Sequence, residues 1–340
     1  MRIDEKMKLY ESDISISERE LLPLNGPGNY RVKDGVIWTR AIEINAVRHC
    51  NLSCRGCSHS SPLEGYFVLQ PNEIASSLRK LSRFLKAETI RVVGGEPLLH
   101  PNLSLLLCAV RESRIAEQIC LVTNGILLDQ IDEEILSCFD EIQISLYPLS
   151  EQIVSRIYKN VERVSKICEK VKVLKYSFFR EAITNDMTEN QTLCNRIYET
   201  CQIAHYWRCM TVEQGFLYRC PQSMVLMRKY DQKEEMNDKL EIKSIKKMED
   251  VLCFLENNNS LRACASCLGS VGTVFEHEQV HKDLWVSRLP TIPEEGVDYN
   301  FMDELEKNAR ADNDCMKIYK RRRESNEKVN EEYFAGIKAV

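Results

Sequence analysis

The sequence predicts an α/β fold built on a parallel sheet, followed by a smaller part that is rich in cysteine. Between residues 41 and 179, short apolar runs alternate with segments of helical periodicity, a pattern typical of right-handed βαβ units. Each polar or glycine-containing cluster in this region directly follows one of the apolar runs. Because the carboxyl ends of parallel strands lie at one edge of a sheet or barrel, we expect these clusters to meet there.

The elements of this main domain can be placed in order from periodicity and turn residues. A β-hairpin is expected over residues 30–38, turning at Asp34-Gly35. The strands are expected at residues 41–47, 89–93, 119–123, 141–146 and 171–179. The helices are expected at residues 71–85, 102–113, 129–138 and 149–168.

The pattern changes after about residue 198. A second hairpin is expected, with strands at 207–211 and 216–220 and a turn at Gln214-Gly215. A charged helical segment at 232–257 and a final helix containing Lys320–Arg323 are expected after it. These shifts divide the chain into an N-terminal extension (1–40), a main α/β domain (41–198), a cysteine-rich domain (199–270) and a charged, mostly helical segment (271–340).

Composition narrows the class of protein. The 340 residues are 44% apolar and 29% charged, which is typical of a globular protein. The net charge of −5 argues against a nucleic-acid partner. No apolar run approaches membrane-spanning length and the first residues do not open a signal peptide, so we expect a cytoplasmic protein with no membrane partner. In that compartment, fifteen cysteines favour metal or redox roles.

Three cysteines, Cys50, Cys54 and Cys57, directly follow the first expected strand. Three thiolates on one loop can hold three irons of a [4Fe–4S] cluster, which leaves the fourth iron open to a small molecule. The alternative is a zinc site completed by His49 or His59, or by a second cysteine pair later in the chain.

The turn Gly94-Gly95-Glu96-Pro97 ends the second strand. Two glycines let the backbone approach a ligand closely, and a carboxylate or carbonyl oxygen there can accept a hydrogen bond from an ammonium group. Placed one βα unit after the cysteine loop, this turn resembles that of the radical S-adenosylmethionine (radical SAM) superfamily. The resemblance covers residues 41–180.

The resemblance implies a partial (β/α) barrel of five or six parallel strands. It implies a cluster on the three cysteines and S-adenosylmethionine on the open iron, cleaved to a 5′-deoxyadenosyl radical that abstracts a hydrogen atom. The Gly94–Glu96 turn would receive the methionyl amino group. Further cofactor contacts would come from Asn124, Ser145 and Arg156, although Arg156 could equally be a solvated helix arginine. The family usually has an aromatic residue before the third cysteine, where this chain has Gly56.

A second group of cysteines resembles the ligands of the twitch domain, a shortened relative of the SPASM domain. The pattern is a cysteine, then Gly-x4-Cys, then Cys-x2-Cys, and its cysteines here are Cys201, Cys220, Cys264 and Cys267. It implies one auxiliary [4Fe–4S] cluster, and so two clusters in all. Cys209 is an alternative to Cys201 as the first ligand, although it lies too close to Gly215 for the pattern.

The nearest likeness is to the dehydrogenases and epimerases of aminocyclitols and aminoglycosides. It implies oxidation of an alcohol to a ketone on a sugar or aminocyclitol, with the auxiliary cluster accepting an electron and a flavodoxin or ferredoxin as reducing partner. Arg180 is then the candidate proton acceptor at the barrel mouth. If Cys209 instead returns a hydrogen atom, the enzyme is an epimerase. A third alternative is modification of a ribosomal peptide, and a fourth is a non-enzymatic metal-binding module.

Overall fold

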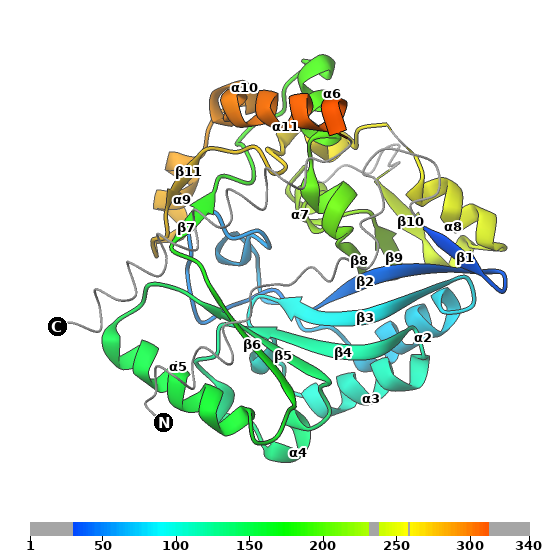
Figure 1. Cartoon of the computed structure of the whole chain (residues 1–340), viewed down its shortest axis with the longest axis vertical. Helices are drawn as coiled ribbons and strands as arrows, with labels where there is room; N and C mark the ends of the chain where they lie inside the picture. The colour runs from blue at the N-terminus through cyan, green and yellow to red at the C-terminus, as the bar shows by residue number, and fades with distance from the viewer. Residues whose placement is uncertain (1–29, 231–237, 258, 313–340) are drawn as a thin grey trace.

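The computed structural model describes residues 30–230, 238–257 and 259–312, and its centre is a nine-stranded sheet (Figure 1). In order across the sheet, its strands are β10 (Lys239–Glu241), β9 (Phe216–Tyr218), β8 (Met210–Glu213), β2 (Val36–Val47), β3 (Leu85–Gly94), β4 (Ala116–Thr123), β5 (Glu141–Leu146) and β6 (Lys170–Lys175), with β1 (Arg31–Lys33) beside β2. The strands from β8 to β6 pair in parallel. The predicted parallel α/β fold is confirmed.

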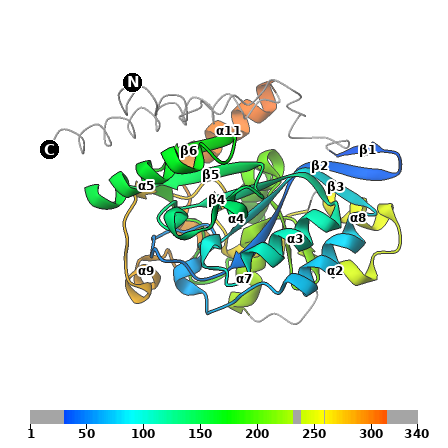
Figure 2. The same ribbon diagram turned by 90° about the horizontal axis from the view of Figure 1, so that it is seen from below.

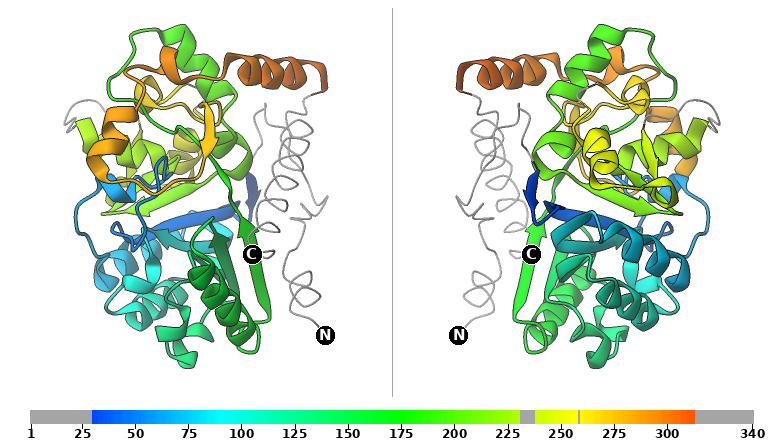
Figure 3. Two further views of the ribbon diagram at one scale, coloured as in Figure 1. Left: turned by 90° about the vertical axis from the view of Figure 1, so that its left-hand side faces the viewer. Right: turned by 90° about the vertical axis from the view of Figure 1, so that its right-hand side faces the viewer.

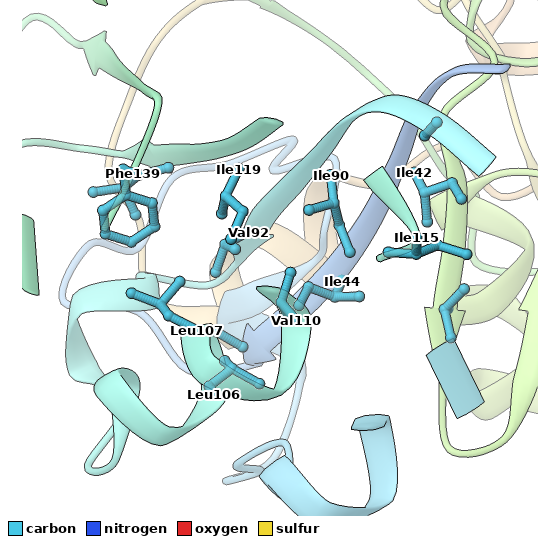
Figure 4. Packing of buried hydrophobic residues seen from close by; sticks show 14 of the residues in the cluster. Ile42, Ile44, Ile90, Val92, Leu106, Leu107, Val110, Ile115, Ile119 and Phe139 are labelled. Atoms are coloured by element: carbon cyan, nitrogen blue, oxygen red, sulfur yellow. The ribbon is translucent and has the colours of Figure 1, made fainter. Parts of the chain in front are cut away.

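Helices cover one face of the parallel strands (Figure 2). They are α2 (Pro71–Leu81), α3 (Leu103–Ser113), α4 (Glu133–Leu136) and α5 (Glu151–Val164). Alternate strand residues such as Ile42, Ile44 and Ile90 pack against them in the main hydrophobic core (Figure 4). The strand residues between these, such as Glu43, therefore point to the opposite face of the sheet, which is the interior of the barrel.

The residues after 200 cover that interior face, so β2 lies between the two halves of the molecule (Figure 3). The helix α6 (Gln191–Glu199) lies just before this part, whose own helices are α7 (Pro221–Tyr230), α8 (Met248–Leu255), α9 (Lys282–Arg288), α10 (Pro293–Gly296) and α11 (Tyr299–Asp312). The β8–β9 hairpin turns at Gln214 and Gly215, as expected, with φ of 48° and 79°. Because β8 pairs with β2, this hairpin continues the main sheet.

Several boundaries differ from the sequence expectations. The first hairpin and the first parallel strand share one long strand, β2, which crosses the boundary expected at residue 40. Leu85 begins β3 rather than ending a helix, because three residues after α2 already turn the chain back to the sheet. The helix expected at 129–138 is reduced to a 3-10 turn at Leu128–Gln130 and α4.

The largest differences lie at the ends of the sheet. The strand expected at 171–179 stops at Lys175, and Phe178–Arg180 forms β7, which pairs with β11 (Val274–Glu276) in a separate two-stranded sheet. The described residues of the charged segment at 232–257 include β10 and a short helix, α8, whereas α7 forms where no helix was expected. The expected helix with Lys320–Arg323 lies outside the described residues. No helix in the described ranges has the length and apolar character needed to cross a bilayer.

Candidate functional site

The three cysteines of the loop after β2 are close enough to influence one another electrostatically. Burial raises the pKa of Cys50 to about 12, and nearby Glu96 and Cys57 contribute to the shift. Burial also raises the pKa of Cys54, with contributions from the charges of Cys57 and Cys50. Nearby positive charge stabilises crowded thiolates, and the irons of a cluster would supply it. These residues therefore fit the three-cysteine set of a [4Fe–4S] cluster. In the described ranges, no three His, Cys, Asp or Glu side chains are grouped as ligands of one metal ion.

The Gly94-Gly95 turn packs directly on the loop that follows β2 and carries Cys50, Cys54 and Cys57, which is called the cluster loop below. The backbone nitrogen of Gly95 donates to the carbonyl oxygen of Val47 at 2.8 Å, and that of Glu96 donates to His49 at 3.0 Å. A Cβ atom would lie 2.2 Å from the Val47 oxygen at Gly94, and 1.9 Å from the His49 oxygen at Gly95. Both distances are far below van der Waals contact. The two glycines thus allow close approach to the protein's own cluster loop.

The Glu96 carboxylate ties the ends of β3 and β4 together. It accepts hydrogen bonds from the Thr123 hydroxyl at 2.7 Å and from the backbone nitrogens of Asn124 and Leu98 at 2.9 and 3.1 Å. Glu96 is 1% exposed, and burial raises its pKa to about 7 despite these donors. The side chain holds the turn in place. Its role as a partner of the methionyl amino group remains a prediction.

Asn124 and Ser145 lie where the topology predicts, at the carboxyl ends of β4 and β5. The Asn124 amide donates to Asn51 Oδ1 at 2.7 Å and lies 3.8 Å from Cys50 Sγ, so it contacts the cluster loop directly. Ser145 is buried and hydrogen-bonds Tyr147, whose pKa is raised by burial and by the charges of Cys54 and Cys57. Strand ends from three βα units therefore converge on one loop.

Two predicted site residues point elsewhere. Arg156 lies on α5 with 41% of its side chain exposed, and its guanidinium forms two 2.8 Å hydrogen bonds to Asp129. It is the solvated helix arginine, because α5 lies on the outer face of the sheet. Arg180 is in β7, outside the main sheet; its guanidinium donates to Gly272 O at 2.8 Å and stacks 4.5 Å from the Phe301 ring centroid. The role of Arg180 as a proton acceptor at the barrel mouth remains a prediction.

Residues 274–280, in the segment expected to be charged and mostly helical, cover the cluster loop. The Val280 nitrogen donates to Ser53 O at 2.9 Å, and the Arg55 nitrogen donates to Glu278 O at 3.0 Å. His277 Nε2 lies 3.1 Å from Cys54 Sγ. These contacts could not be predicted from the sequence. His277 and Cys54 are 223 residues apart, and no local pattern indicates that they meet.

Phe275 of the same segment fills the space beside Gly56. Gly56 has φ of 67°, and a Cβ atom there would lie 2.6 Å from the Phe275 ring. The Arg55 guanidinium stacks 4.1 Å from the centroid of that ring. The aromatic residue that the resemblance leads one to expect before the third cysteine is thus absent from the loop, while an aromatic ring from another segment occupies the adjoining space.

The second group of cysteines forms one buried cavity. Its lining includes Cys201, Cys220, Cys264 and Cys267, each no more than 8% exposed. Burial raises the pKa of all four thiols, to about 12 for Cys220, and the charges of neighbouring cysteines add to the shift at Cys220, Cys264 and Cys267. Backbone nitrogens of Ser223 and Gly269 donate to the sulfurs of Cys220 and Cys267 at 3.4 and 3.2 Å. Four thiols around one cavity, with backbone donors to sulfur, are a donor set that fits a fully ligated [4Fe–4S] cluster.

Cys209 is not among the residues that line this cavity. It lies just before β8 and hydrogen-bonds Glu43 on the interior face of the barrel, and both burial and the Glu43 charge raise its pKa. Arg91 contacts Glu43 at 3.4 Å and Gln143 at 2.5 Å. Cys209 thus belongs to a polar group inside the barrel, and Cys201 is the better first ligand of the cavity.

A buried ion-pair network lies at the neighbouring strand ends. Glu213, at the end of β8, accepts from Arg48 at 2.5 Å and from Arg228 at 2.8 Å, and only 2% of its side chain is exposed. Arg228 also contacts Glu64 at 3.0 Å. The network joins the start of the cluster loop to β8 and α7.

Comparison with known proteins supports the interpretation of Cys50, Cys54 and Cys57 as the ligands of a cluster. Residues 44–187 match the model of the Radical SAM superfamily. The chain is 28% identical over 191 residues to a probable GTP 3′,8-cyclase of Methanocaldococcus jannaschii, covering 53% of this chain and 63% of the relative. It is 30% identical over 133 residues to the GTP 3′,8-cyclase of Chlorobaculum tepidum, covering 38% and 40%. The chain therefore spans less than two thirds of the length of these relatives.

Two solved structures show weaker similarity. One is BtrN in complex with AdoMet and 2-DOIA, with 17% identity and a TM-score of 0.39, covering 64% of this chain and 82% of that one. The other is anSMEcpe with bound AdoMet, with 15% identity and a TM-score of 0.40, covering 65% and 81%. Similarity at this level does not define a shared function. Residues 44–187, which contain the three-cysteine loop and the Gly-Gly-Glu turn, therefore form a radical SAM domain.

Proposed function

We propose that this protein is a radical SAM oxidoreductase that converts an alcohol to a ketone on a small polyhydroxylated substrate of the sugar or aminocyclitol type. The observation that carries the proposal is the buried cavity lined by Cys201, Cys220, Cys264 and Cys267. An auxiliary cluster with four protein ligands has no open iron for substrate, so its chemical use is to accept or donate an electron. An electron acceptor is what an alcohol oxidation requires after a hydrogen atom has been removed.

The reaction balances with these parts. When bound at the first loop, the cluster and S-adenosylmethionine supply a carbon radical that takes one hydrogen atom from the carbinol carbon. The hydroxyl would lose its proton to a base or to water, and a cluster held by Cys201, Cys220, Cys264 and Cys267 would accept the remaining electron. The carbinol has lost two hydrogen atoms in all, which gives the ketone.

Polar side chains inside the barrel support a hydroxylated substrate. Glu43 is 4% exposed and lies on the interior face of β2, and Arg91 on β3 donates hydrogen bonds both to Glu43 and to Gln143 on β5. A carboxylate, a guanidinium and an amide together can both accept from and donate to hydroxyl groups. The guanidinium of Arg180 donates to Gly272 O, and a carboxylate accepts a proton more readily than a guanidinium, so Glu43 is the preferred candidate proton acceptor.

A second candidate function is epimerisation with Cys209 as hydrogen-atom donor. The observation that favours it is the position of Cys209 inside the barrel, hydrogen-bonded to Glu43 and outside the four-cysteine cavity. A thiol there can return a hydrogen atom to the substrate radical, and re-reduction of the sulfur then needs one electron and one proton. The auxiliary cluster would supply the electron and Glu43 the proton.

The test is product analysis of the reconstituted, reduced protein with a panel of aminocyclitols, amino sugars and GTP in deuterated water. The proposal predicts a product two mass units lighter than its substrate, with no deuterium on carbon. Unchanged mass apart from one deuterium on carbon, abolished in Cys209→Ala, supports epimerisation instead. Turnover of GTP alone would contradict both and favour the reaction for which the relatives are named. Cys108→Ala, an exposed thiol on α3, is the matched control.

A further inference from the structure

We propose that His277 is a positioning residue of the cluster loop, whose ring N–H donates a hydrogen bond to the Cys54 sulfur and raises the reduction potential of the cluster held there. The inference depends on the cluster at Cys50, Cys54 and Cys57, and not on the substrate or the outcome of the reaction. It assigns a role at this loop to a residue that is remote in sequence and belongs to another part of the fold.

The contact is direct and buried. His277 Nε2 lies 3.1 Å from Cys54 Sγ, within hydrogen-bond distance for sulfur, and both residues are less than 10% exposed. A cysteine that binds iron does so as a thiolate and has no proton to donate. The ring nitrogen must therefore be the donor when the cluster is in place. A neutral imidazole then leaves Nδ1 as an acceptor, and Nδ1 has no partner among the described residues.

Two aromatic rings and one backbone hydrogen bond hold His277 in place. Tyr147 stacks on it with a centroid distance of 5.0 Å and an interplanar angle of 9°. Phe179 meets it edge-on at 4.9 Å, and the His277 backbone nitrogen donates to Ser177 O at 2.7 Å. A side chain so confined loses little entropy on making the hydrogen bond.

The segment that carries His277 is held against the loop independently of the ring. Ser53 and Val280 exchange hydrogen bonds, with the Val280 nitrogen donating at 2.9 Å and the Ser53 hydroxyl at 2.5 Å. Arg55 contacts Glu278 at 2.8 Å. Replacing the imidazole therefore leaves the two segments paired, which makes the role of the ring separable from that of the segment.

A hydrogen bond to cysteine sulfur stabilises the added negative charge of the reduced cluster, so it raises the potential. Loss of the donor lowers the potential and decreases the fraction of cluster that a given reductant can reduce. Cluster reduction precedes cleavage of S-adenosylmethionine, so cleavage slows as well.

Three variants distinguish the effect of the His277 hydrogen-bond donor from the effects of its ring and of the segment that carries it. His277→Phe keeps the ring stack and removes the donor, whereas His277→Gln keeps an N–H at similar reach. His281→Phe, at an exposed position four residues along, is the control. The measurement is a redox titration by electron paramagnetic resonance, in which the signal that changes on adding S-adenosylmethionine identifies the cluster with the open iron.

We expect His277→Phe to retain its iron, to need a more negative potential for half-reduction, and to cleave S-adenosylmethionine ~10-fold more slowly. His277→Gln and His281→Phe should resemble the wild type. An unchanged potential in His277→Phe overturns the inference, as does a shift of equal size in His277→Gln. If His277→Phe loses iron, His277→Leu replaces it and is judged by the same two outcomes. If the wild type holds its cluster but forms no ketone, the proposed function fails while the potentials still decide this inference.

Discussion

The α-carbon of Gly95 lies so close to the carbonyl oxygen of His49 that a side-chain carbon at Gly95 would be 1.9 Å from it. Gly95→Ala must therefore push the turn away from the cluster loop. We expect a loss of about 2–4 kcal/mol in unfolding free energy and a large loss of bound iron. Iron analysis and thermal unfolding measure both. Gly65→Ala, where an added Cβ meets nothing within 4 Å, should change neither; equal effects in the two variants would contradict the packing argument.

If the four-cysteine cavity holds a second cluster, the iron content of the protein follows. The reconstituted protein should bind about eight irons per chain, and Cys264→Ala should reduce this to about four. The matched control is Cys194→Ala, a thiol that is 3% exposed in the same hydrophobic cluster but is not among the residues lining the cavity. If Cys194→Ala loses as much iron as Cys264→Ala, the assignment of the ligands is wrong.

Glu96 predicts a pH dependence of stability. Burial raises its pKa from 4.5 to about 7, so between these values the folded state binds a proton that the unfolded state has released. The stability contributed by this carboxyl is fully present below pH 4.5 and is lost as the pH rises through 7, by up to about 3 kcal/mol. Thermal unfolding of wild type and Glu96→Gln at pH 5 and pH 8 tests this. The fall in stability between the two pH values should be smaller in the variant, and an equal fall would exclude Glu96 as its source.

The Glu213 network predicts a strong effect of a neutral substitution. Glu213→Gln leaves Arg48 and Arg228 with one carboxylate between them, and breaking a buried ion pair costs about 3 kcal/mol. Denaturant unfolding measures this cost. The comparison is Arg156→Gln, which removes an exposed pair with Asp129 and should cost less than about 1 kcal/mol.

Arg156→Gln also tests whether Arg156 takes part in binding S-adenosylmethionine. Because Arg156 is on the outer face of α5, the affinity for S-adenosylmethionine should be unchanged in this variant. Asn124→Ala, which removes the amide at Asn51 and Cys50, should weaken it. Equilibrium binding to the reconstituted protein decides the matter, and weaker binding in Arg156→Gln would restore the sequence prediction.

The features that could be predicted from the sequence are those that local patterns or known topology rules determine. Strand–helix periodicity identified the parallel sheet, and the rule that strand ends converge placed Asn124 beside the cluster loop. The resemblance to the twitch pattern grouped Cys201, Cys220, Cys264 and Cys267, and all four line one cavity. These features depend on short-range spacing or on a topology with a fixed hand.

The features of the site that were not predicted depend on contacts between segments that are far apart in the sequence. The pairing of β7 with β11 turns Arg180 towards Phe301, and no pattern near residue 180 indicates that pairing. The same pairing brings Phe275 to Gly56 and His277 to Cys54. A glycine in place of an aromatic residue was visible in the sequence, but the residue that adjoins it was not.

The central claim is that Cys50, Cys54 and Cys57 hold a cluster that cleaves S-adenosylmethionine. The direct measurement is 5′-deoxyadenosine released by the anaerobically reconstituted protein on reduction with dithionite, with Cys54→Ala as control. The account predicts release that requires both reductant and S-adenosylmethionine and is lost in Cys54→Ala. Protein that holds about eight irons per chain yet releases no 5′-deoxyadenosine, with or without the substrate panel, would contradict it.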